Sequence, residues 1–88
     1  ELSPDYSVVE IAAPADFIGK NLRDINVRAK FRVNVIAIKS KVPSISEDGE
    51  TEIKEEINIA PVADNEVKQG DILVIIGMAK DIEQLRER

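Results

Sequence analysis

Two side chains in the middle of the chain, Arg28 and Asn34, have the chemistry to contact a small phosphorylated ligand. Arginine presents a planar group of donors that matches phosphate oxygens, and asparagine offers both a donor and an acceptor to a nucleobase. Asn34 also interrupts an aliphatic segment, where an unpaired buried amide costs roughly 1 to 3 kcal/mol. Its amide therefore needs a partner, which is either a bound ligand or a neighbouring backbone group.

Both residues lie in or beside a basic segment, residues 20–32, in which Asp24 is the sole acid. The cations of this segment are Lys20, Arg23, Arg28, Lys30 and Arg32. A local excess of positive charge attracts small anions. The alternative is that these are ordinary solvated charges that pair with nearby acids.

Few other residues point to chemistry. The 88 residues include no His and no Cys, so imidazole bases, thiolate nucleophiles and the usual zinc ligand sets are excluded. The acids at 47–56 lie in or beside a predicted hairpin, without the apolar pocket that shifts a pKa or the spacing of a calcium loop. No glycine-rich phosphate loop is present. We therefore expect no enzymatic activity, no catalytic residue, no metal site and no cofactor.

Length and charge limit the possible partners. The chain has 12 Lys and Arg against 17 Asp and Glu, a formal net charge of −5, which disfavours a nucleic-acid polymer as partner. A chain of this size buries only somewhat more than about 60% of its unfolded surface, so burial against a second subunit is a plausible source of stability. Its longest apolar run, residues 72–76, is far below the roughly 18 residues of a membrane-spanning helix. We expect a dimeric cytoplasmic domain.

The apolar pattern predicts an α+β fold in the order β-α-β-β-β-α, with one sheet and helices on one of its faces. Strands are expected at residues 6–13, 32–40, 52–60 and 71–77, because Val and Ile cluster there between Gly, Pro and Asp. A helical stripe runs through Ile18, Leu22, Ile25 and Ala29, with an interruption expected at Asn26. A second stripe of Met78, Ile82 and Leu85 predicts a C-terminal helix.

The middle strands carry more specific expectations. In the second strand, strict alternation places Val33, Val35 and Ala37 on one face and Asn34, Ile36 and Ile38 on the other. The third strand is expected to have one apolar face formed by Ile53, Ile57 and Ile59. Residues 41–51 combine Pro, Ser and Asp-Gly, which predicts a mobile hairpin tip that binds nothing.

Four short motifs resemble the RCK C-terminal (TrkA-C) domain. They are GKNL at residues 19–22, VIAI at 35–38, IAP at 59–61 and GDILVIIG at 70–77, and residues 24–38 are most similar to the gating subunits of Ktr potassium transporters. The resemblance implies a TrkA-C-like homodimer and a single RCK C-terminal domain over residues 1–88. It also implies that the domain is cut from a longer chain with an N-terminal nucleotide-binding RCK domain.

In such gating subunits the domain belongs to a cytoplasmic ring, peripheral to the membrane through the potassium-pore subunit. The resemblance implies a regulatory ligand, cyclic di-AMP, bound between two copies of the domain to modulate potassium uptake. By position, Arg28 would contact a phosphate and Asn34 an adenine or ribose group. Val27, Ala29 and Pro61 would form apolar walls. The alternative is a purely structural dimerisation module of the gating ring that binds no ligand.

Two departures from the family pattern leave the ligand preference open. Arg32 stands where a small residue, often Gly, precedes the second strand, and the hairpin at residues 41–51 is longer than usual.

Overall fold

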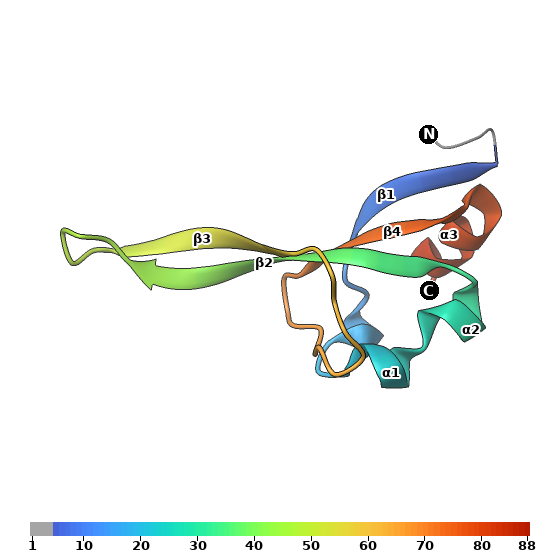
Figure 1. Cartoon of the computed structure of the whole chain (residues 1–88), viewed down its shortest axis with the longest axis horizontal. Helices are drawn as coiled ribbons and strands as arrows, with labels where there is room; N and C mark the ends of the chain where they lie inside the picture. Colours follow the sequence, from blue (N-terminus) through green and yellow to red (C-terminus); the bar gives the residue numbers. More distant parts are fainter. Residues whose placement is uncertain (1–4) are drawn as a thin grey trace.

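The computed structural model describes residues 5–88, which form one antiparallel four-stranded sheet with helices on one of its faces (Figure 1). The sheet order is β1-β4-β2-β3. The elements along the chain are β1 (Tyr6–Ala12), the 3₁₀ helix η1 (Ala15–Phe17), α1 (Leu22–Ile25), α2 (Val27–Phe31), β2 (Asn34–Ile45), β3 (Thr51–Asn58), β4 (Ile72–Met78) and α3 (Ala79–Arg86). The predicted α+β class, strand number and helix placement are confirmed.

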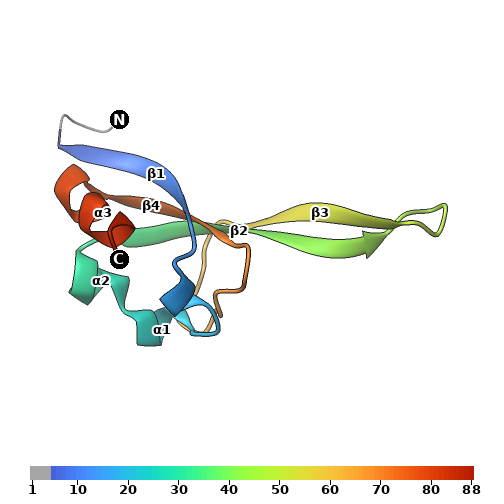
Figure 2. The ribbon, with the colours of Figure 1, turned by 180° about the vertical axis from the view of Figure 1, so that it is seen from behind.

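The hydrophobic core lies between the sheet and the helices, as Figure 2 shows from behind. Alternate residues of the central strand β4, Leu73 and Ile75, are fully buried and point toward the helices. Leu85 of α3 and Val67 of the β3–β4 connector are fully buried in the same cluster. The predicted C-terminal stripe therefore contributes to the core through Ile82 and Leu85.

A β-bulge in β2 breaks the strict alternation expected from the sequence. Val35 lies opposite Ile75, whereas Ala37 lies opposite Val74, so Ile36 is the extra residue. Beyond the bulge, Ile38 is buried toward the helices, on the same face as Val35. The predicted grouping of Ile38 with Asn34 is wrong because one inserted residue reverses the faces of all later residues.

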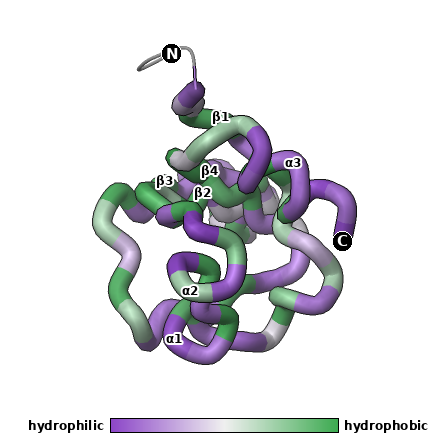
Figure 3. Tube along the Cα trace, turned by 90° about the vertical axis from the view of Figure 1, so that its right-hand side faces the viewer, coloured by the Kyte–Doolittle hydropathy of each residue, from purple (hydrophilic) through white to green (hydrophobic). Residues whose placement is uncertain are grey.

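The first helical region is divided as expected at Asn26. This residue has φ 53° and ψ 52°, a left-handed conformation that ends α1 and begins α2. Asparagine adopts this conformation more readily than most residues. Ile18 lies outside both helices, just after η1, so the predicted stripe is not one helix. In the end-on view of Figure 3, α1 and α2 lie below the strands.

A two-stranded ribbon, residues 40–57, extends from one end of the sheet and is called the arm below (Figure 1). The predicted loop at residues 41–51 is wrong in extent, because β2 continues to Ile45 and β3 begins at Thr51. The apolar residues predicted for one face of β3 are not covered, since every residue of β3 is exposed, and Ile59 lies just beyond the strand. Among residues 5–88, no helix lies over the arm.

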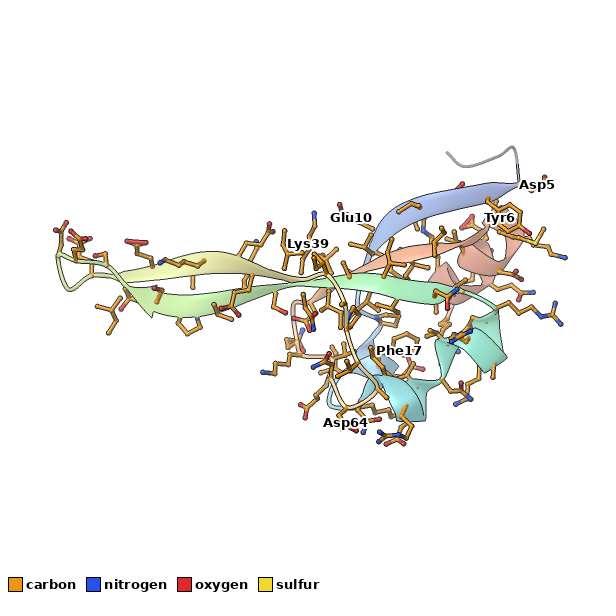
Figure 4. All side chains as sticks on the ribbon, viewed as in Figure 1. Asp5, Tyr6, Glu10, Phe17, Lys39 and Asp64 are labelled. Atoms are coloured by element: carbon orange, nitrogen blue, oxygen red, sulfur yellow. The ribbon has the colours of Figure 1, made fainter. Side chains whose placement is uncertain are left out.

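The outer face of the sheet, opposite the helices, has no covering element within residues 5–88. On this face Lys39 Nζ donates a hydrogen bond to Glu10 Oε2 at 2.9 Å, which joins β2 to β1 and raises the pKa of Lys39 above its usual value. Figure 4 shows Lys39 and Glu10 close together above the sheet and Phe17 below it. In the described part of the chain, every helix is too short or too polar to cross a membrane.

Candidate functional site

A cavity of about 400 Å³ lies at the edge of the sheet where β2 begins. Residues 34–37 of β2 pair with β4 on one side only, because β3 joins β2 at Ile38. The cavity occupies the other side of this segment, and its walls come from α1, the α1–α2 junction, α2, β2 and the β3–β4 connector. The lining residues are Leu22, Arg23, Asn26, Val27, Arg28, Asn34, Val35, Pro61, Val62 and Ala63.

Four of the five site residues named from the sequence line this one cavity: Val27, Arg28, Asn34 and Pro61. Ala29 does not line it and borders a separate hollow instead. Consecutive helical residues point about 100° apart, so Val27 and Arg28 can share the cavity while Ala29, about 200° from Val27, points away from it. Arg32, the residue that departs from the family pattern, lies with Ala29 in the separate hollow.

Arg28 and Asn34 both present polar groups to solvent at the cavity. Arg28 is exposed in α2, one residue after the helix begins, and forms no ion pair among residues 5–88. Asn34 is exposed as well, so the predicted buried amide is wrong. Its side chain forms no hydrogen bond within the described part of the chain. Both side chains can therefore bind a ligand without first breaking an internal contact.

The connector that forms the wall at residues 61–63 is fixed by Asn65. Its Oδ1 accepts hydrogen bonds from the backbone N–H of Val62 at 2.7 Å and from Asn58 Nδ2 at 3.0 Å. Its backbone carbonyl accepts from the N–H of Leu22 at 3.0 Å. These bonds attach the connector to the first turn of α1, so the distance between these two walls of the cavity is fixed.

Charge in the cavity is unevenly distributed between its two arginines. Arg23 Nη2 lies 2.5 Å from Asp64 Oδ1, and its backbone N–H donates to the carbonyl of Ala63 at 3.0 Å. The carboxylate of Asp64 partly neutralises Arg23 and fixes it against the connector. The guanidinium of Arg28 is therefore the main group available for an anion.

Sequence reasoning missed several of the lining residues. Leu22 and Val35 carry signals of helical and strand core positions, and both also pack against the core. Asn26 was noted as a helix interruption, and that left-handed turn is what places the two helices around the cavity. Val62 and Ala63 follow Pro61 in a connector whose path depends on Asn65, a long-range contact that no local pattern indicates.

The side chains that line the cavity suit the binding of a small ligand. Its lining contains no carboxylate, hydroxyl or thiol side chain that could act as a base or nucleophile. A guanidinium and an amide lie instead between aliphatic walls, an arrangement that suits a phosphate attached to a planar base. Within residues 5–88, no cluster of His, Cys, Asp or Glu is arranged to hold a metal ion.

Comparison with known proteins identifies the family. The profile of the family described as TrkA-C domain matches residues 6–88. The chain belongs to the TrkA-C domain family. The resemblance drawn from the four sequence motifs is therefore confirmed.

Two curated relatives of this TrkA-C chain come from Bacillus subtilis (strain 168). The Ktr system potassium uptake protein C is 34% identical over 88 residues, which are 100% of this chain and 34% of the relative. The Ktr system potassium uptake protein A is 32% identical over 84 residues, 96% of this chain and 32% of the relative. The chain thus spans about a third of the length of these relatives.

Two solved structures share the TrkA-C fold. The RCK C domain of the potassium transport protein KtrA, in complex with cyclic diadenosine monophosphate (c-di-AMP), is 27% identical, with a TM-score of 0.70 over 93% of this chain and 81% of that chain. The GsuK RCK domain is 19% identical, with a TM-score of 0.70 over 98% of this chain and 16% of that chain. At that identity the second structure bears on the fold alone.

Proposed function

We propose that this chain is the ligand-sensing domain of a gating subunit in a potassium uptake system, and that two copies bind one c-di-AMP between their edge cavities. Both curated relatives are potassium uptake proteins, and one structural relative was solved with c-di-AMP. The domain acts by binding and not by catalysis. It is cytoplasmic and reaches the membrane through a pore subunit.

The observation that carries this proposal is the convergence of Arg28 and Asn34 on one cavity without internal partners. Arg28 contacts a phosphate, and Asn34 contacts the adenine or ribose. Val27 and Pro61 cover the faces of the base. A volume of about 400 Å³ is near the lower end for small-molecule sites, so one cavity holds half of a dinucleotide.

In a two-fold symmetric dimer, each of the two chains contributes one such cavity to the ligand site. In an isologous interface each protomer presents the same patch, so one set of residues serves both halves of a symmetric ligand. The open edge of β2 at residues 34–37 leaves the cavity accessible to a second copy. Ala29 lies outside the cavity of its own chain. It can therefore contact only the half of the ligand that the partner's cavity holds.

Regulation follows from linkage between the ligand and the arrangement of the two protomers. A ligand that contacts both protomers changes their relative orientation only as far as it binds one arrangement more tightly than another. That difference in affinity is the free energy available to shift the attached ring between pore states.

Replacement of Arg28 tests the proposal. We expect Arg28→Ala to weaken c-di-AMP binding about tenfold to a hundredfold, because a hydrogen bond to a charged group contributes about 1.5 to 3 kcal/mol. Thermal melting is a suitable readout, since ligand at 100 times its dissociation constant adds about 2.7 kcal/mol to the stability of the wild-type domain. Lys30→Ala is the matched control, because Lys30 is an exposed cation of the same helix that does not line the cavity.

The same experiment separates sensing from a purely structural role. If saturating c-di-AMP leaves the melting temperature of the wild-type domain unchanged, the sensing role is wrong and a dimerisation module remains. If Arg28→Ala and Lys30→Ala weaken binding equally, the basic segment attracts the ligand as a whole and the cavity is not its site.

A further inference from the structure

The arm carries an unpaired strand edge. Beyond Lys39, β2 pairs with β3 alone, and the other edge of β3 has no neighbour among residues 5–88. All eight residues of β3 are exposed. A ribbon of two strands is only marginally stable in water by itself, so an exposed arm of this length gains stability from further strands.

One face of the arm carries exposed isoleucines that alternate with charged residues. Residues directly opposite each other in an antiparallel pair share a face, which places Ile53 with Pro43 and Ile57 with Lys39. The exposed fractions of Ile45, Ile53 and Ile57 are 74%, 65% and 52%. This face continues the outer face of the sheet, where Lys39 lies opposite Ile72. Figure 4 shows the side chains of the arm projecting on both sides without contact to the helices.

Charges on an edge strand usually prevent pairing with another chain. In β3 they are arranged so that an antiparallel pairing of the whole strand with an identical strand, centred on Glu55, brings opposite charges together. With Glu55 opposite its own copy, Lys54 lies opposite Glu56 and Ile53 opposite Ile57. Two-fold symmetry produces each of these favourable pairs twice.

We propose that the arm is a self-association surface, on which β3 of one chain pairs antiparallel with β3 of a second copy about Glu55. The two arms then form a four-stranded sheet in which Ile53 of each chain lies opposite Ile57 of the other, on the same face as Glu55. The central Glu55 is compensated, because within each arm it lies opposite Lys41. The row across the new sheet is thus Lys, Glu, Glu, Lys.

The charges also select this register against its neighbours. A pairing centred on Lys54 places Lys54 opposite its own copy and Glu52 opposite Glu56. A pairing centred on Glu56 removes the Lys54–Glu56 pairs and places Glu55 opposite Ile57. The register centred on Lys54 is disfavoured because like charges lie directly opposite each other. The register centred on Glu56 is disfavoured because it loses both Lys–Glu pairs and still places one Glu opposite its own copy. The contact uses residues outside the ligand cavity and does not depend on c-di-AMP.

Two charge-reversal variants, one at Lys54 and one at Glu56, test this contact. We expect Lys54→Glu and Glu56→Lys each to weaken self-association about tenfold or more, because both symmetric pairs become repulsive. An equimolar mixture of the two variants restores association, since every pair between unlike chains is again Glu opposite Lys. The measurement is sedimentation of the whole chain over a range of concentrations, without ligand.

Glu47→Lys is the matched control. It makes the same charge change at the exposed tip of the same arm, outside the paired residues, and we expect it to leave association unchanged. Amide hydrogen exchange gives a second readout, with β3 protected at high concentration and exchanging rapidly at low concentration. The proposal is overturned if the mixture associates no better than the single variants. It is also overturned if wild-type β3 gains no protection on concentration, which would leave the edge for a different protein.

Discussion

Arg32 has a left-handed backbone, with φ 60° and ψ 32°, at the end of α2. Outside glycine this conformation costs roughly 1 to 2 kcal/mol, since Cβ lies too close to the carbonyl oxygen. Helices commonly end on a glycine in this conformation for the same reason. The Arg side chain is exposed and forms no ion pair among the described residues, so no such contact offsets this cost.

We therefore expect Arg32→Gly to stabilise the domain by about 1 kcal/mol. Arg32→Ala is the control, because alanine removes the charge but keeps Cβ, and it should leave stability within about 0.5 kcal/mol of the wild type. Urea unfolding of the three proteins measures both values. Equal stabilisation by Gly and Ala would show that charge, and not backbone strain, determines the effect.

At this scale the sequence indicated several side chains that the fold brings together in one cavity. The side-chain chemistry of Arg28 and Asn34, together with the family motif that ends at Pro61, was sufficient to name three residues that line one cavity. Ala29 lies outside this cavity because its direction depends on the helical phase that Asn26 sets for α2. The expected burial of Asn34 failed because the start of β2 lacks a neighbour on one side.

At the scale of elements, β4 approaches the start of β2 so closely that position 77 has no room for a side chain. A Cβ on Gly77 would lie 2.8 Å from Val33 Cγ1 and 3.3 Å from Val33 Cβ. Val33 is fully buried, and as a β-branched residue it has little freedom to rotate away. Glycine at 77 therefore permits the close packing of these two segments.

Gly77→Ala is expected to destabilise the domain by about 1 to 3 kcal/mol through overpacking. In a Val33→Ala background the added methyl group has space, so the double variant should be more stable than the sum of the two single effects predicts. Denaturant unfolding of the four proteins measures this coupling. Strictly additive effects would show that the two positions do not compete for space.

The arm shows where local patterns were insufficient. Pro43 and the Asp48-Gly49 pair are turn signals, and they predicted a loop over residues 41–51. Pro43 instead lies inside β2, where the strand has β3 as its one neighbour and a missing N–H can be tolerated. The actual turn is confined to residues 46–50, around Gly49 with φ 83°. The alternation of Ile53 and Ile57 correctly indicated a strand, but periodicity does not show whether an apolar face is covered.

At the scale of the whole molecule, the chain is 48 Å long and 27 by 22 Å across, and the arm accounts for its elongation (Figure 1). The cavity and the arm both lie on the side of the sheet where β3 is added to β2. If both proposed contacts form, one depends on ligand and the other on protein concentration, and together they permit assembly beyond a dimer.

The central claim is that two chains share one ligand, and calorimetric titration of c-di-AMP into the whole domain tests it most directly. Use of the Glu56→Lys variant removes the contribution of the arm. The account predicts saturation at one c-di-AMP per two chains, with a mass of two chains in the saturated complex. Saturation at one ligand per chain, with the mass of a single chain, would contradict it.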